Sequence, residues 1–415
     1  MITVKEALNT ILDVISPLGC ENVDVLNSLG RVIGEDIYAP RDIPPKDNSA
    51  MDGYALRSED TAGADAERPV ALSVTEDIPA GYAPSKEVGA GEAARIMTGA
   101  PVPEGADAVV MVEETESDDS AVRIYTQASK GQHIRYAGED VKEGELVIRR
   151  GTLLRPAEIG MLSALGCSRV KIYQKPLVAI IATGDELVDI DGAASPGKIV
   201  SSNSYSLAAQ VMECGGVPLQ IGIARDNKEA LAEKFTDALR ADIIVSSAGV
   251  SVGDYDFVKD VMTDMGISIE FWQVAERPGK PMTFGMKKNT LFFGLPGNPV
   301  SSMITFEQYV RPAILKMTGH SNIFRKTIRA QLSEDITKKR GLRYFIRGCI
   351  SSGEGKYIVK TTGEQGSGIL KSMVLANGII VIPEDMDFVK AGSEVKVQLL
   401  DASQDCTETP EYLDD

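Results

Sequence analysis

The sequence predicts a multidomain α/β protein with a parallel sheet at its centre and β-rich modules before and after it. Between residues 175 and 322, short apolar runs alternate with segments of helical periodicity. Strands that alternate with helices form parallel sheets that are covered on both faces. Short β-type runs broken by Gly and Pro occupy residues 46–137 and 323–403. We therefore expect an α/β domain, a β-rich domain that precedes it and a small β-barrel that follows it.

Composition restricts the class of protein. The 415 residues allow two to four domains with well-buried cores. A net charge of −17 argues against general binding to nucleic acid or to an acidic membrane surface. The five cysteines are scattered and form no CxxC pair, which is typical of a reducing cytoplasm and excludes a cysteine zinc site. No apolar run reaches the length of a membrane span, so we expect a cytoplasmic protein without nucleic-acid or membrane partners.

The first residues and the segment after the first β-rich module predict one discontinuous domain. Val4–Ile15 places apolar side chains on one face of a helix, and a proline-rich linker follows at Pro40–Pro45. A second helix is expected to begin near Pro156, because proline is tolerated in the first helical turn. The expected bounds are residues 1–45 with 138–174 for this domain, and 46–137 for the β-rich lid inserted into it.

Strand and helix pairs are expected to alternate within residues 175–322. The strands are expected at 177–182, 219–223, 243–246 and 290–293, and the helices at 205–214, 229–239, 257–265 and 300–317. Ligands in such folds bind at the carboxyl ends of the strands. The most distinctive polar segments follow those ends, at Thr183–Leu187, Arg225–Asn227, Ser247–Asp254 and Gly294–Asn298. After the barrel at 323–403, residues 404–415 are expected to form an acidic tail.

The stretch from Arg277 to Ser302 has the features of an oxyanion site. Arg277 and Lys280 lie in an RPGKP turn, and the strand that follows runs through a GLPGNP turn into a helix. The first N–H groups of a helix and its dipole favour an anion, and Ser301 adds a hydroxyl group. An ordinary strand-to-helix turn is the alternative interpretation of the GLPGNP segment alone. The two upstream cations favour the oxyanion site.

Carboxylates at the same strand ends indicate a divalent cation. Glu186 closes one strand, and Asp226 and Asp256 belong to the same rim by the parallel-sheet argument. A solvated turn with a helix cap is the alternative interpretation. Neighbouring buried acids repel one another unless a cation such as Mg²⁺ or a substrate group bridges them. The two histidines, His133 and His320, lie in no recognisable motif, so we expect catalysis by metal and electrostatics.

Residues 47–55, DNSAMDGYA, pose a separate question. The Asn, Ser, Asp and Gly residues of this segment all favour a turn, which is one interpretation. A segment that links two domains is also where a lid carries catalytic groups, and Asp52 is then the candidate.

Eight segments, in order along the chain, resemble the MoeA family, molybdopterin molybdenumtransferase, which is related to the gephyrin E domain. They are DNSAMDGYA (47–55), IMTGAPVPEGADAVV (96–110), GED (138–140), TGDEL (183–187), SSAGVSVGDYDF (246–257), RPGKP (277–281), GLPGNPVSS (294–302) and QGS (365–367). The resemblance covers nearly the whole chain. It implies a MogA-like parallel-sheet α/β domain with an inserted β-rich lid, a discontinuous N-terminal domain and a C-terminal β-barrel.

The resemblance also implies a reaction, in which molybdate is inserted into adenylylated molybdopterin with Mg²⁺ and with release of AMP. A homodimer is implied, and the apolar face of Val4–Ile15 favours it because a short discontinuous domain cannot bury that face alone. Molybdopterin adenylyltransferase is a further candidate partner. Two alternatives stay open: a MogA-type adenylyltransferase, which would lack the lid segments, and a non-catalytic gephyrin-like scaffold, against which the intact acids weigh.

Family positions matched in this sequence give the candidate site residues. Those with a catalytic role are Asp52, Thr98, Asp140, Glu186, Asp226 and Asp256, of which Asp52, Glu186 and Asp256 are the candidates for holding Mg²⁺. Those that bind substrate or oxyanion are Ser251, Arg277, Lys280, Pro296, Gly297, Asn298, Pro299, Ser301, Arg343 and Ser367. Arg277 stands where relatives often have Lys, which keeps the charge but replaces a point charge with a planar fork.

Overall fold

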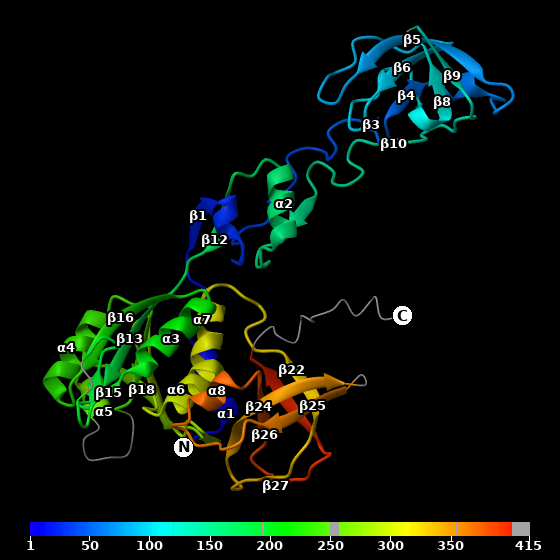
Figure 1. Cartoon of the computed structure of the whole chain (residues 1–415). Helices are drawn as coiled ribbons and strands as arrows, with labels where there is room; N and C mark the ends of the chain where they lie inside the picture. Colours follow the sequence, from blue (N-terminus) through cyan, green and yellow to red (C-terminus); the bar gives the residue numbers. More distant parts are fainter. Residues whose placement is uncertain (119, 193–194, 250–256, 354–355, 401–415) are drawn as a thin grey trace. The chain divides into compact units, whose positions relative to one another are not determined.

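The computed structural model describes residues 1–118, 120–192, 195–249, 257–353 and 356–400. The chain divides into two compact units (Figure 1). Unit 1 contains Met1–Glu21 and the chain from Ile172 onward, and unit 2 contains Asn22–Lys171. Among the described helices, none has the length and apolar character needed to cross a membrane.

A six-stranded sheet forms the centre of unit 1, in the order β16–β13–β17–β21–β20–β18. The first four strands run parallel, so their carboxyl ends meet at one edge, as the alternating pattern predicts. The hairpin strands β18 and β20 were not expected, because β20 begins with Pro281 and contains Gly285, which read as turn signals. The strands are β13 (Leu177–Thr183), β16 (Val217–Ala224), β17 (Ile243–Ser247), β18 (Ser268–Gln273), β20 (Pro281–Lys287) and β21 (Thr290–Leu295).

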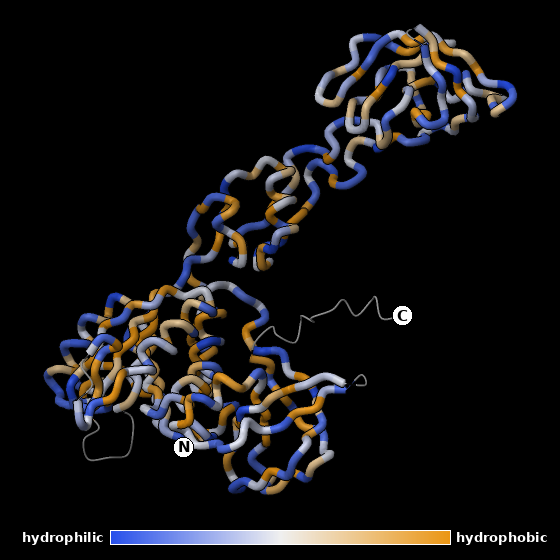
Figure 2. The backbone as a smooth tube through the Cα atoms, viewed as in Figure 1, coloured by the Kyte–Doolittle hydropathy of each residue, from blue (hydrophilic) through white to orange (hydrophobic). Residues whose placement is uncertain are grey.

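Helices cover both faces of this sheet because its buried strands are apolar on both sides. In Figure 2, the strand segments of this sheet are coloured mostly as hydrophobic. One face, with Ile180 and Val245, packs against helices α3, α6 and α7. The other face, with Ile181 and Ile244, packs against helices α4 and α5. These helices are α3 (Ser202–Glu213), α4 (Lys228–Ala238), α5 (Phe257–Asp264), α6 (Pro299–Thr305) and α7 (Arg311–Met317).

Helix α1 (Val4–Asp13) corrects one expected domain assignment. Its apolar face, with Ala7 and Ile11 fully buried, belongs to the core of the α/β domain, and Lys316 of α7 donates from Nζ to the Leu12 carbonyl oxygen at 2.7 Å. Residues 1–21 therefore pack with unit 1 and not with the discontinuous domain. An amphipathic pattern shows that a face is buried but not what buries it. Because this apolar face is buried within one chain, it no longer supports a homodimer.

The C-terminal β-barrel is closed, as expected from the short-strand pattern. Its five strands follow the order β24–β25–β22–β28–β26, and β26 pairs back onto β24. A short strand of the α/β domain, β19 (Glu276–Arg277), pairs with the start of β24 at Arg343 and Tyr344. The expected RPGKP turn is thus attached to the barrel sheet. The barrel strands are β22 (Thr327–Leu332), β24 (Arg343–Gly353), β25 (Lys356–Thr361), β26 (Gly378–Ile382) and β28 (Glu394–Leu399).

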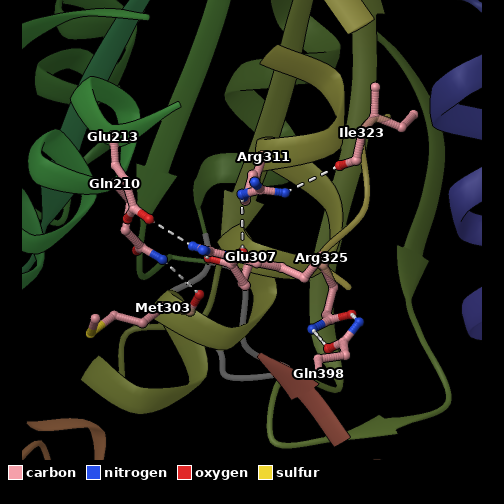
Figure 3. A network of polar contacts seen from close by, with 9 residues as sticks. Gln210, Glu213, Met303, Glu307, Arg311, Ile323, Arg325 and Gln398 are labelled. Carbon is pink, nitrogen blue, oxygen red and sulfur yellow. Dashed lines mark hydrogen bonds and ion pairs between the residues drawn. The ribbon is translucent and has the colours of Figure 1, made fainter. Parts of the chain in front are cut away.

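An ion-pair network around the buried Glu307 ties the chain that leads into the barrel to the α/β domain (Figure 3). The expected helix at 300–317 contains a π-helical segment, η4 (Phe306–Val310), between α6 and α7. Glu307 of η4 accepts a hydrogen bond from Arg325 Nε at 2.6 Å, and Arg325 also pairs with Glu213 of α3 at 2.8 Å. A buried carboxylate that lost such a partner would be strongly destabilised. The network therefore fixes the segment after α7.

Unit 2 contains the expected β-rich lid, a six-stranded sheet in the order β7–β4–β6–β5–β9–β8 with apolar clusters on both faces. Gly53 begins β4, and a Cβ there would lie only 1.9 Å from the Val110 carbonyl oxygen, so the DNSAMDGYA segment needs glycine at this point. The rest of the unit includes helix α2 (Pro156–Ala164). The lid strands are β4 (Gly53–Leu56), β5 (Val70–Ile78), β6 (Glu92–Ile96), β7 (Ala108–Met111), β8 (Thr115–Ser117) and β9 (Ala121–Ile124).

Candidate functional site

A pocket of about 450 Å³ lies at the carboxyl ends of the parallel strands of unit 1. Its volume is within the range of small-molecule sites. Thr183 ends β13 and Ser247 ends β17, and both line the pocket together with the first residues of α3. Of the residues selected from the sequence, Glu186, Pro296, Gly297, Asn298 and Pro299 line it too.

Close packing of backbone shapes the floor of this pocket. Ala248 adopts φ +75°, a left-handed conformation that is costly for a residue with a Cβ, and its N–H donates to the Leu295 carbonyl oxygen at 3.0 Å. Directly beside it, a Cβ at Gly297 would lie 2.9 Å from the Ala248 Cβ. The glycine of the GLPGNP turn is therefore required by the close approach of the turn to the end of β17.

Asn203, in the first turn of α3, is a pocket residue that the sequence analysis missed. Its Nδ2 donates to Ser247 Oγ at 2.6 Å and to the Gly297 carbonyl oxygen at 2.8 Å. Its Oδ1 is buried and has no hydrogen-bond partner among the described residues. An acceptor in that state is suited to a donor on a ligand. The available signal was the polar run Ser201–Ser204 at the start of a helix.

Three acids, Asp185, Glu186 and Asp226, lie close together after β13 and β16, and we call them the acid wall. Of the three, Glu186 lines the pocket. The Asp185 N–H donates to Asp226 Oδ2 at 3.4 Å. Partial burial raises the pKa of Asp226; the hydrogen bond from Asp185 opposes this effect, and the charges of Glu186 and Asp185 add to it. The carboxylates therefore repel one another, as expected at these strand ends. Arg225 offsets part of this charge, with NH1 at 3.9 Å from Asp185 Oδ1.

The acid wall does not form a complete metal site by itself. Within the described ranges, no three His, Cys, Asp or Glu side chains are arranged to hold a metal ion. Mg²⁺ is commonly bound by only one or two carboxylates, with water and substrate phosphate oxygens completing its octahedral shell. Repelling carboxylates beside an open pocket fit that mode of binding, in which the ligand supplies the other oxygens.

The segment Arg277–Pro281, which we call the cation turn, carries the opposite charge. Pro281 lines the strand-end pocket, and the neighbouring Lys280 is exposed. The Lys280 carbonyl oxygen accepts from the Val274 N–H at 3.0 Å, while its ammonium has no hydrogen bond or ion pair among the described residues. Arg277 lies over the ring of Tyr344, 5.6 Å from its centroid, and lines a second pocket of about 630 Å³ on the barrel side. The two cations of the RPGKP motif therefore have different surroundings.

The barrel contributes to the same region through residues 365–372. Asn298 donates from Nδ2 to Ser367 Oγ at 3.0 Å, and the Val300 N–H donates to the Ser367 carbonyl oxygen at 3.0 Å. The structure thus brings the expected barrel serine onto the GLPGNP turn. Ser301 is buried in α6. Arg343 has a carboxylate partner, Glu384, at 2.9 Å, so its charge is already compensated.

Arg347 is a second residue that the sequence analysis missed. It is 1% exposed, lines the barrel-side pocket, and donates from NH2 to the Gly366 carbonyl oxygen at 3.0 Å and from Nε to Ser372 Oγ at 3.0 Å. Burial lowers its pKa to about 10, which leaves the guanidinium charged at neutral pH. A lone arginine in the apolar run Phe345–Ile350 was the available signal, since a buried charge is costly without a function or a partner.

The remaining selected residues lie elsewhere. In unit 2, Asp52 Oδ1 accepts hydrogen bonds from both Thr98 Oγ1 and the Thr98 N–H at 2.7 Å, and the Thr98 hydroxyl followed by its N–H lowers the pKa of Asp52. Asp140 is exposed in a turn of the same unit, where its N–H donates to the Ile43 carbonyl oxygen at 3.1 Å. Ser251 and Asp256 lie outside the described residues.

Fold and site together define a class: a multidomain α/β protein whose strand-end pocket is lined by a residue of the cation turn and a residue of the acid wall, and is suited to an anionic small molecule. Comparison with known families agrees. Models described as "MoeA N-terminal region (domain I and II)", "Probable molybdopterin binding domain" and "MoeA C-terminal region (domain IV)" match residues 2–166, 179–316 and 329–400.

Individual relatives match over nearly their whole length. A molybdopterin molybdenumtransferase from Nostoc sp. is 39% identical over 407 residues, which cover 96% of this chain and 93% of the relative. The molybdopterin molybdenumtransferase 2 of Mycobacterium tuberculosis is 39% identical over 383 residues, covering 90% and 94%. The crystal structure of a molybdopterin biosynthesis moeA protein from Pyrococcus horikoshii OT3 matches with a TM-score of 0.80 at 35% identity, covering 96% and 100%. The chain belongs to the MoeA family of molybdopterin molybdenumtransferases.

Proposed function

We propose that this chain transfers molybdenum, supplied as molybdate, to adenylylated molybdopterin, and that AMP is released when the phosphoanhydride of the pterin nucleotide is hydrolysed. The observation that carries this proposal is the strand-end pocket, which is lined by Pro281 of the cation turn, next to Lys280, and by the carboxylate Glu186. Such a pocket offers separate places for an oxyanion and for a cation that shields phosphate groups.

Lys280 is the proposed ligand of the oxyanion. Its ammonium has no partner among the described residues, and Pro281 next to it lines the pocket. A flexible ammonium can follow a tetrahedral oxyanion as it arrives and leaves. The Asn298–Ser367 pair would lie beside the same ligand. The start of α6 offers few donors, because Pro299 has no N–H and the Val300 N–H already donates to the Ser367 carbonyl oxygen. Arg277 and Arg347 line the neighbouring barrel-side pocket and raise the positive potential there.

Mg²⁺ is the proposed metal, with Glu186 on the pocket wall as its ligand in unit 1 and Asp226 beside it. Asp256, and Asp52 in unit 2, stay metal candidates on the family resemblance alone; the hydrogen bonds from Thr98 lower the pKa of Asp52. When bound, Mg²⁺ would neutralise phosphate charge and polarise the phosphoanhydride. Glu186 and Asp226 place negative charge beside the pocket. Because these charges repel phosphate, a phosphate group would bind beside them only together with a cation.

The two alternative functions are less well supported. An adenylyltransferase would need the α/β domain alone, whereas the family match extends over residues 2–166 and 329–400. A scaffold would need no open pocket lined by Glu186 and by Asn203, whose buried Oδ1 has no hydrogen-bond partner among the described residues.

We also propose a cytoplasmic homodimer. The cysteines within the described ranges, Cys20, Cys167, Cys214 and Cys349, are all free thiols, which supports a reducing compartment. The dimer now rests on the family resemblance, since α1 is buried within one chain. Sedimentation at micromolar concentration should give a species of twice 44.5 kDa; a single 44.5 kDa species would contradict the dimer.

Reconstitution with purified protein tests the function directly. Adenylylated molybdopterin, molybdate and Mg²⁺ should yield AMP and a molybdenum-containing pterin, and omission of Mg²⁺ should stop AMP release. Formation of adenylylated molybdopterin from molybdopterin and ATP, without metal insertion, would show the adenylyltransferase instead. Absence of both reactions in protein that binds the pterin nucleotide would support the scaffold.

A further inference from the structure

Glu276 is a carboxylic side chain that is fully buried next to the cation turn. It belongs to β19, directly precedes Arg277 and is 0% exposed. Its Oε2 accepts a hydrogen bond from the Tyr309 hydroxyl at 2.5 Å. Its Oε1 has no hydrogen-bond partner among the described residues. A carboxyl group in this state needs an explanation, because buried polar atoms are almost always satisfied.

The carboxyl group supports the turn from below. At Gly279, which adopts φ +109°, a Cβ would lie 2.6 Å from Glu276 Oε1 and 2.5 Å from Thr305 Oγ1. The turn backbone therefore rests against these two oxygens, one from β19 and one from α6. Thr305 Oγ1 is also buried and has no hydrogen-bond partner among the described residues. The position of the turn, and with it the direction of Lys280, depends on what fills this space.

The charge state of Glu276 follows from its surroundings. Burial raises its pKa to about 8, while the hydrogen bond from Tyr309 and the charge of Arg343 act in the opposite direction. Arg343 of β24 is already paired with Glu384, and Tyr309 of η4 is held in its neutral form because burial and the neighbouring carboxyl raise its pKa. Arg277, next in the chain, is exposed and directed at Tyr344. Glu276 is therefore predominantly protonated at pH 7 and ionised at pH 9.

We propose that Glu276 is a positioning residue for the oxyanion: as a neutral buried acid it seats the Arg277–Lys280 turn, and its ionisation weakens oxyanion binding. An ionised carboxylate at this place would draw the cations of the turn toward itself and repel a dianion in the pocket. This inference rests on the proposed role of Lys280 and makes that role depend on the protonation of Glu276. Oxyanion binding is then coupled to one buried proton.

The test compares wild type with Glu276→Gln, which keeps the shape and still accepts the Tyr309 hydrogen bond. The measured quantity is the molybdate concentration for half-maximal insertion, taken from pH 6.5 to 9. In wild type it should rise about tenfold between pH 7 and pH 9, as the ionised fraction grows around pH 8. In Glu276→Gln it should stay within about twofold of the wild-type value at pH 7. Glu270→Gln, at an exposed site in β18, is the matched control and should follow wild type.

A second variant keeps the inference testable if Glu276→Gln fails to fold. Tyr309→Phe removes a hydrogen bond that lowers the pKa of Glu276, so the rise in half-maximal molybdate concentration should move to higher pH. A purely structural tyrosine would leave that pH unchanged. A pH-independent wild type, or an unchanged profile in both variants, overturns the inference. The underlying function fails separately, if Lys280→Ala leaves the molybdate dependence unchanged at pH 7.

Discussion

The cation turn and the acid wall each contribute a residue to the lining of the strand-end pocket, Pro281 and Glu186, but the two segments are held in place in different ways. The cation turn is attached to the barrel through β19 and β24 and rests on the buried oxygens of Glu276 and Thr305. The acid wall consists of exposed loop side chains after β13 and β16. Its carboxylates make weak contacts, a 3.4 Å hydrogen bond and a 3.9 Å ion pair, while the Asp185 carbonyl oxygen accepts from Arg225 at 3.1 Å and from Lys198. The proposed oxyanion site is thus preorganised, whereas the side chains of the proposed metal site can adjust.

The largest expected effect comes from overfilling the space below the cation turn. Gly279→Ala introduces a Cβ that meets two buried oxygens at 2.5 and 2.6 Å and also enforces an unfavourable φ of +109°. We expect a loss of about 2–4 kcal/mol in the free energy of unfolding, from strain and overpacking together, and loss of insertion activity. Chemical denaturation measures the first and AMP release the second.

The matched control is Gly341→Ala, where φ is +92° but no atom lies within 4 Å of the added Cβ. It should show the backbone strain alone, about 1–2 kcal/mol, with activity retained. Equal losses in the two variants would mean that the space under the turn is not tightly filled, and the contrast with the acid wall would fail.

Removal of the cation has the next largest effect. Lys280→Ala should raise the half-maximal molybdate concentration by about ten- to a hundredfold, because a charge-assisted contact contributes about 1.5–3 kcal/mol. Binding of the pterin nucleotide, measured by calorimetry, should change less. The control is Lys288→Ala, which is exposed and lacks a partner among the described residues. Lys287 is unsuitable because its Nζ donates to the Met265 carbonyl oxygen at 2.7 Å. Weaker nucleotide binding with unchanged molybdate dependence would refute this assignment.

Substitutions in the acid wall should lower activity without lowering stability. Glu186 is exposed, so Glu186→Gln should keep the wild-type melting temperature while AMP release falls by more than about tenfold. Asp52→Asn in unit 2 should behave in the same way. Glu229→Gln, an exposed acid in the first turn of α4, serves as the control. A residual rate within about twofold of wild type would show that these acids only form turns.

The smallest effect is expected at Asp226, whose raised pKa indicates that its charge is unfavourable in the folded state. For such an acid, stability falls as pH rises from its ordinary titration range through the raised value. Asp226→Asn should therefore leave stability at pH 7 unchanged or raise it by less than about 0.5 kcal/mol, while the Mg²⁺ concentration needed for activity increases. A clear loss of stability would mean that the acid wall is a structural element like the cation turn.

The parts of this contrast that the sequence predicted are those that depend on local pattern. Alternating apolar strands and helices place Thr183, Ser247 and Leu295 at one sheet edge, so the strand-end pocket was expected. The attachment of β19 to β24 joins residues 276–277 to 343–344, and no local pattern encodes such a pairing.

Buried polar residues were hardest to predict. Glu276, Arg347 and Asn203 owe their roles to what surrounds them after folding, and in the sequence they are only polar residues beside apolar ones. The helix at Val4–Ile15 illustrates the same limit, since its pattern predicted burial correctly but the wrong neighbour. Long-range packing decides such cases.

The central claim is that the cation turn, and not the acid wall, receives the oxyanion. Crystals of the full chain soaked in molybdate, measured at the molybdenum absorption edge, locate the metal without assumptions about the rest of the site. The anomalous peak should lie beside the Lys280 ammonium, in the pocket lined by Pro281 and Asn298, and should vanish in Lys280→Ala crystals. A peak that persists in that variant, or one beside Glu186 and Asp226, would contradict the account.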